Sequence, residues 1–85
     1  MTTGTTASGT FYIFNKKEQQ TPIVFIHGVG LTHEIWQPQL DFFKNHSTLS
    51  YDILGHGKSS LEKEKISFDD FSDQLINLME ELNIN

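Results

Sequence analysis

The residues best suited to chemistry stand in two short glycine-containing segments, each directly after an expected β-strand. The first segment is His27-Gly28-Val29-Gly30, which follows the apolar run at 23–26. Glycine lets a backbone turn sharply and come close to a substrate. Fixed backbone N–H groups in such a turn stabilise the negative charge that develops on a carbonyl oxygen during acyl transfer. The segment could therefore bind an oxyanion, although the same glycines could also serve only to reverse the chain between a strand and a helix.

The second segment, residues 52–59, reads D-I-L-G-H-G-K-S. Its end, Gly57-Lys58-Ser59, matches the end of the phosphate-binding loop G-x-x-x-x-G-K-[ST]. That loop needs a glycine at position 52, where this chain has Asp, and a carboxylate there would repel phosphate. No helix signal follows Ser59 directly. A phosphate-binding module that uses Gly57-Lys58-Ser59 is therefore kept only as an alternative.

The remaining polar residues give little support for a serine nucleophile or a metal site. Ser59 and Ser60 are not in a G-x-S-x-G elbow, a motif that occurs nowhere in the chain, so their hydroxyls are interpreted as turn caps. The four histidines lack metal-ligand spacing such as H-E-x-x-H, and the chain has no Cys. His27 stands beside a turn and is expected to hold the loop by hydrogen bonds rather than to act as a base. The sequence predicts no metal and no cofactor.

Composition and charge exclude several kinds of partner. Six basic residues against eleven acidic ones give a net charge of −5. The basic residues are scattered along the chain, whereas binding to nucleic-acid phosphates needs clustered Lys and Arg. The longest apolar run is too short to span a bilayer, and the first ten residues do not resemble a secretory signal. We therefore expect a cytoplasmic protein with no nucleic-acid partner and no membrane partner.

Strands and helices are expected to alternate after a polar N-terminal tail. Residues 1–9 are rich in Thr and Gly and are expected to be disordered. Strands are expected at 10–14, 23–26 and 47–53. The run at 23–26 is apolar without alternation, which is typical of a strand covered on both faces. Pro38 indicates the start of a helix between the second and third strands. Strand, helix and strand then form a βαβ unit with two parallel strands.

A second helix is expected after Ser67, an N-cap residue, with Asp70 completing a capping box. Its apolar residues recur at intervals of three and four: Phe68, Phe71, Leu75, Leu78 and Leu82. Such an amphipathic stripe must cover a sheet face. A helix of this kind normally leads to another parallel strand, and the chain ends at Asn85, where that strand would begin. Residues 10–85 are therefore expected to be an incomplete α/β domain.

Together the two segments resemble the front part of an α/β-hydrolase. His-Gly-x-Gly followed by a loop and Trp36 resembles the family's oxyanion loop, and D-x-x-G-H-G-x-S resembles the segment after its next strand. The resemblance covers residues 10–85 and implies a partial α/β-hydrolase fold, with a mostly parallel sheet and two crossover helices. It implies that the backbone N–H of Val29, in a loop opened by Gly28, is one oxyanion donor. It gives a structural role to the other matched residues: His27, Gly30, Asp52, Gly55, His56, Gly57 and Ser59.

The same resemblance implies a serine-type hydrolase that acts on a small ester or lactone, similar to enol-lactone hydrolases and related esterases. The nucleophile, acid and His of the family come later in its chain order, so the 85 residues are expected to show no turnover alone. The small-molecule substrate would belong to the full-length enzyme. The same fold also serves dehalogenases, epoxide hydrolases, haloperoxidases and C–C hydrolases. An alternative from another class is a small non-catalytic interaction protein, which would bind a partner through an exposed sheet edge and the apolar helix stripe.

Overall fold

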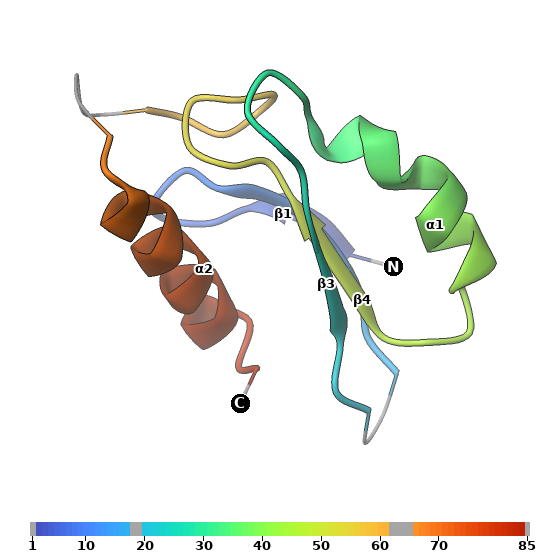
Figure 1. Ribbon diagram of the computed structural model, residues 1–85. Helices are drawn as coiled ribbons and strands as arrows, with labels where there is room; N and C mark the ends of the chain where they lie inside the picture. Colours follow the sequence, from blue (N-terminus) through green and yellow to red (C-terminus); the bar gives the residue numbers. More distant parts are fainter. Residues whose placement is uncertain (1, 18–19, 62–65, 85) are drawn as a thin grey trace.

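The computed structural model describes residues 2–17, 20–61 and 66–84, in which three strands are followed by a 3₁₀ helix, an α-helix, a fourth strand and a second α-helix (Figure 1). The strands are β1 (Thr2–Thr5), β2 (Phe11–Asn15), β3 (Ile23–Ile26) and β4 (Thr48–Tyr51). The helices are the 3₁₀ helix η1 (His33–Trp36), α1 (Gln37–Phe42) and α2 (Phe68–Glu81). Pro38 lies in the first turn of α1, where its fixed φ suits the helix and its missing N–H costs no hydrogen bond.

The described strands form one mixed sheet in the order β1-β2-β4-β3. β3 and β4 run parallel, with Ile23 opposite Thr48 and Ile26 opposite Tyr51, which is the pair that the βαβ prediction joins through α1. The β1–β2 and β2–β4 pairs are antiparallel. The α/β fold class is confirmed, but the sheet is mixed rather than mostly parallel. The antiparallel pairing of β2 with β4 brings together strands that are not consecutive in the chain, so no connection between them indicates their direction.

β3 lies at one edge of the described sheet, so the expectation that both of its faces are covered is not met. Ile23 is 37% exposed and Ile26 is 48% exposed. Phe25, between them, is half-buried and packs on Trp36, with ring centroids 5.1 Å apart. The apolar run without alternation predicted a fully covered strand, whereas among the described residues β3 is only partly covered.

Strand β1 corrects the prediction that residues 1–9 form a disordered tail. It pairs with β2 in register from Thr2 opposite Phe14 to Thr5 opposite Phe11. The turn between the strands is closed by hydrogen bonds from the Thr6 N–H to the Thr10 carbonyl and from the Gly9 N–H to the Thr6 carbonyl, both 2.9 Å. Composition failed here because the pairing uses backbone groups, and β-branched Thr fits an exposed edge strand.

The helices α1 and α2 cover opposite faces of the sheet (Figure 1). On the α2 face, Leu78 packs against Leu49 and Tyr51 of β4, and Phe14 and Ile53 complete this buried core. β3 and β4 pair in parallel. The carboxyl ends of these two parallel strands therefore lie side by side.

Helix α2 begins at the predicted N-cap. The Ser67 N–H donates to Asp70 Oδ2 over 2.8 Å, and the capping box is present. Leu78 is buried at 1%, but Phe68 is 85% exposed, so the first residue of the predicted stripe is not a core residue. α1 is a crossover helix between β3 and β4; among the described residues no strand follows α2 to make it a second one. In the described parts of the chain, no helix has the length and apolarity to cross a membrane.

Candidate functional site

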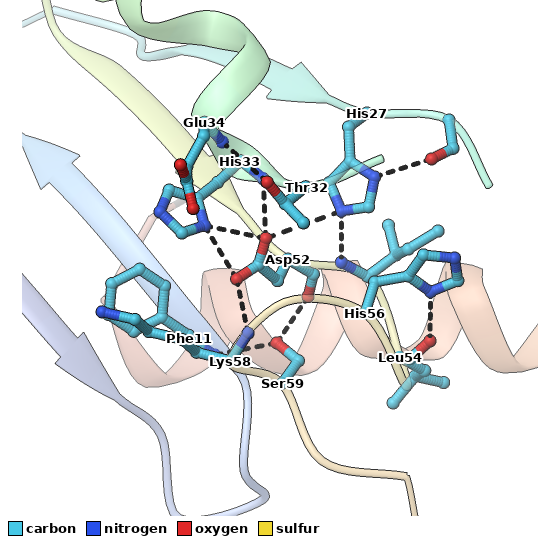
Figure 2. A network of polar contacts seen from close by, with 12 residues as sticks. Phe11, His27, Thr32, His33, Glu34, Asp52, Leu54, His56, Lys58 and Ser59 are labelled. Carbon is cyan, nitrogen blue, oxygen red and sulfur yellow. Dashed lines mark hydrogen bonds and ion pairs between the residues drawn. The ribbon is translucent and has the colours of Figure 1, made fainter. Parts of the chain in front are cut away.

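The two glycine segments meet at one edge of the sheet, because β3 and β4 are parallel and each segment follows the carboxyl end of its strand. We call residues 27–31 loop 1 and residues 52–59 loop 2. Figure 2 shows the polar contacts that join them. Ligand sites of open α/β sheets lie at the carboxyl ends of the strands, so this edge is the candidate site.

Loop 1 contains a tight turn that presents Val29. The Leu31 N–H donates to the Gly28 carbonyl over 3.1 Å, and Gly30 has a φ of 89°. This hydrogen bond and a positive φ at the third residue are the features of a type II turn, with Val29 at its second position. Val29 is 79% exposed. Over the part of the chain that the structure describes, its backbone N–H has no hydrogen-bond partner.

Two histidines tie the loops to each other. His27 of loop 1 accepts the Ile53 N–H at Nε2, 3.0 Å away, and His56 of loop 2 accepts the Gly30 N–H at Nε2, also 3.0 Å away. A ring nitrogen that accepts a hydrogen bond carries no proton. His27 is buried at 4%, and its Nε2 is occupied by a backbone donor. The contact joins loop 1 to loop 2, and the expectation that His27 does not act as a base stays a prediction.

Asp52 lies fully buried at the start of loop 2 and gathers donors from both sides. Its Oδ1 accepts the His33 N–H over 2.6 Å and its Oδ2 accepts the Lys58 N–H over 2.9 Å. His33 Nδ1 lies 2.8 Å from both carboxylate oxygens. Burial raises the pKa of Asp52, but the hydrogen bonds from Lys58 and His33 outweigh burial and hold this pKa below its ordinary value. Asp52 is therefore a buried carboxylate that is kept ionised by its donors.

Gly57 leaves the space that the Asp52 carboxylate occupies. Gly57 has a φ of 50°, and a Cβ at this position would collide with the carboxylate of Asp52. The same loop has a second positive φ at Gly55, 72°. The G-H-G spacing of loop 2 is therefore needed to wrap the backbone around an internal anion.

Ser59 closes loop 2 onto β2. Its Oγ donates to the Asp52 carbonyl over 2.6 Å and accepts the Phe11 N–H over 3.0 Å. The Lys58 ammonium lies 4.9 Å from the centroid of the Phe11 ring. The backbone N–H of Lys58 and the Ser59 hydroxyl thus both serve Asp52, and α2 begins only at Phe68. These contacts argue against the phosphate-binding alternative, because the Lys58 N–H is held by the Asp52 carboxylate and the Ser59 hydroxyl is held by the Asp52 carbonyl.

An apolar groove of about 410 Å³ runs from loop 1 to α2. Its lining includes Ile26, Val29, Tyr51, Phe68, Phe71 and Leu75. Burial raises the pKa of Tyr51 to about 12, so its phenol is protonated throughout the ordinary pH range. Val29 stands at the mouth of this groove. Among the described residues no group of three or more His, Cys, Asp or Glu side chains is arranged to hold a metal ion.

Comparison with known proteins shows which proteins this chain resembles. The chain is 37% identical over 76 residues to (E)-2-((N-methylformamido)methylene)succinate hydrolase of Acinetobacter baylyi, covering 88% of this chain and 28% of that protein. It is 31% identical to 3-oxoadipate enol-lactonase 1 of the same organism, covering 82% of this chain and 26% of that protein. The crystal structure of bromoperoxidase from Bacillus anthracis matches with a TM-score of 0.75 at 30% identity, over 87% of this chain and 27% of that chain.

The chain resembles α/β-hydrolases in sequence and in fold. No family model matches it. A haloalkane dehalogenase from Bradyrhizobium elkani, at 22% identity, shares the fold with a TM-score of 0.79 over 94% of this chain and 28% of that chain. The chain spans 26–28% of the length of the two Acinetobacter relatives.

The structure brings the residues that the sequence singled out together in the two loops, but the sequence missed two of their partners. His33, noted in the sequence only as one of four histidines, is the main side-chain partner of Asp52. Gln74 of α2 is buried at 6%; its Nε2 donates to the Asp52 carbonyl and its Oε1 accepts the Leu54 N–H, both at 3.0 Å. A lone Gln at the border of the apolar stripe of α2 was the available signal for this contact.

Proposed function

We propose that this chain supplies one oxyanion donor, the backbone N–H of Val29, to the active site of a hydrolase that acts on a small ester or lactone. The serine nucleophile of such a hydrolase would lie outside these 85 residues, which contain no G-x-S-x-G. The substrate class is supported by the relatives, which include a hydrolase and an enol-lactonase. Cytoplasmic location remains a prediction from the sequence.

One observation carries the proposal. The neighbouring amides of loop 1 are engaged: Gly30 N–H binds His56 and Leu31 N–H binds the Gly28 carbonyl. The Val29 N–H has no partner within the described residues and stands beside an apolar groove. A fixed, unpaired donor at the edge of an apolar site is what stabilisation of a tetrahedral oxyanion requires.

A chimera tests the role of this amide. Residues 10–84 would replace the matching segment of the Acinetobacter enol-lactonase, whose hydrolysis of its lactone is then measured. Val29→Pro removes the N–H, and proline is favoured at the second position of a type II turn, so the turn is retained. We expect Val29→Pro to lower kcat by about 10²- to 10³-fold with little change in KM.

Val29→Ala is the matched control, since it keeps the N–H and shortens only the exposed side chain. We expect the Ala chimera to retain the kcat of the unsubstituted chimera. A Pro chimera that folds, as judged by circular dichroism, and turns over at the Ala rate would contradict the proposal. The 85-residue chain alone should not turn over a p-nitrophenyl ester, and turnover that Ser59→Ala abolishes would also count against it.

The interaction-protein alternative is favoured by a different observation. The outer edge of β3 has no neighbouring strand in the described sheet, and Phe68 lies 85% exposed beside it. An open strand edge next to an apolar surface can accept a strand from a partner. Lactone hydrolysis by the chimera decides between the two functions, because a segment that serves only as an interaction protein should not restore turnover when it replaces the matching segment of the enol-lactonase.

A further inference from the structure

The contacts of His27 and His56 define the protonation state of both rings. In each ring, Nε2 accepts a backbone N–H of the opposite loop. In each ring, Nδ1 lies within hydrogen-bond distance of a carbonyl oxygen, 2.8 Å from Gly28 O for His27 and 2.9 Å from Leu54 O for His56. A carbonyl only accepts, so Nδ1 must donate, and an acceptor Nε2 must be bare. Both rings are therefore neutral imidazoles with the proton on Nδ1.

The two contacts are reciprocal. The ring of loop 1 holds an amide of loop 2, and the ring of loop 2 holds an amide of loop 1, with the ring centroids 5.5 Å apart. The amide held by His56 belongs to Gly30, the residue directly after Val29. The imidazole lone pair thus holds the peptide between Val29 and Gly30, which is next to the peptide that carries the Val29 N–H, and the turn holds the same loop from the other side.

We propose that His56 and His27 are positioning residues that hold loop 1 only as neutral rings, and that protonation of His56 releases the loop that carries the Val29 amide. A proton on His56 Nε2 would face the Gly30 N–H, and two donors repel each other at that distance. The inference that this release affects an oxyanion donor rests on the proposed function. We call the two reciprocal contacts of His27 and His56 the latch. The latch can be tested whether or not the chain takes part in catalysis.

The surroundings of the two rings differ in what a proton on Nε2 would meet. His27 Nε2 lies 3.7 Å from Asp52 Oδ1, so a protonated His27 would have a carboxylate to donate to. His56 faces the His27 ring, and among the described residues it has no carboxylate within ion-pair distance. The nearby Lys58 ammonium is over the Phe11 ring, and His33 is paired with Asp52.

Nitrogen-15 NMR of the 85-residue chain tests the latch without any turnover. At about pH 8, where imidazoles are largely neutral, both rings should show a protonated Nδ1 and a bare Nε2. As the pH falls to about 5, through the range in which histidines charge, the Gly30 amide resonance should move together with the His56 ring resonances. The Nε2-protonated tautomer at pH 8, or a Gly30 amide that stays still while His56 titrates, would overturn the proposal.

Three variants separate positioning from a general structural role. His56→Gln offers a side-chain carbonyl near the place of Nε2 and cannot be protonated in this range, so the Gly30 amide should remain bonded and lose its pH response. His56→Phe removes the acceptor, so the amide should resemble the acid form at every pH. His46→Gln removes an exposed histidine and should leave the Gly30 titration unchanged. Should His56→Phe fail to fold, the tautomers of the unsubstituted chain and the His56→Gln titration still decide the question.

Discussion

Loop 1 and loop 2 follow neighbouring parallel strands, yet one is exposed and the other is filled with its own contacts. In loop 1, Val29 is 79% exposed and its amide has no partner among the described residues. In loop 2, Asp52 is fully buried and accepts from His33 and Lys58. The comparison indicates a division of roles. Loop 2 is a support that stabilises the fold, and loop 1 is a surface that leaves one donor available.

The largest effect that this division predicts is at Asp52. Asp52→Ala would leave the buried donors of His33 and Lys58 without an acceptor, and such losses cost about 3–5 kcal/mol in buried ionic networks. A chain of this size has little stability to spare, so we expect the variant to be unfolded at 25 °C by circular dichroism. Asp69→Ala, at an exposed carboxylate in the first turn of α2, is the control. An Asp52→Ala chain that unfolds at the normal urea midpoint would remove the central role given to loop 2.

Glycine substitutions sharpen the comparison with one change in each loop. Gly57→Ala puts a Cβ into the Asp52 carboxylate at a positive φ, and overpacking with this backbone strain should cost about 2–4 kcal/mol. Gly28→Ala in loop 1 meets only Leu31 Cδ1 at 3.8 Å and should change stability by less than about 0.5 kcal/mol. Urea unfolding of both variants measures the difference, and equal midpoints would show that the two loops are equally tolerant.

Acid should weaken loop 2 by protonating Asp52, and the stability should be lost more gradually than on substitution of this residue. The pKa of Asp52 is lower in the folded chain than in the unfolded chain, so the unfolded chain binds the proton more readily. This contribution to stability is present above the unfolded pKa, about 3.9, and is lost as the pH falls through the folded value. The slope from one group cannot exceed about 1.4 kcal/mol per pH unit. Urea midpoints measured from pH 7 to pH 2 test this loss of stability, and a ¹³C titration of the Asp52 carboxyl measures its pKa. A pKa at or above the ordinary value for Asp would contradict the prediction.

The sequence predicted the parts of the molecule that local rules control. Pro38 and the cap at Ser67 indicated the two helices, and the two glycine segments indicated the two loops. The mixed sheet was missed because β2 and β4 pair without being consecutive in the chain, so no turn or crossover between them indicates an antiparallel direction. Phe68 was assigned to the core because periodicity defines a helix face but not how far the sheet beneath it extends.

Within the candidate site, the sequence identified residue types but not their partners. His27 and His56 were recognised by their position in motifs. That each ring accepts a backbone N–H from the opposite loop depends on how close β3 and β4 lie, which the motifs do not show. Gln74 was missed because a polar residue on an amphipathic helix reads as solvent-facing until the carbonyl that it reaches is known. Contacts between distant segments are therefore the part that one sequence does not specify.

The hydrogen bond between Ser59 and Phe11 joins residues 48 positions apart. Closing so long a stretch of chain is slow compared with forming a helix. As the polypeptide leaves the ribosome, residues 27–31 must wait for residues 52–59 before they can settle. The Val29 N–H would then reach its final position only after loop 2 has been synthesised.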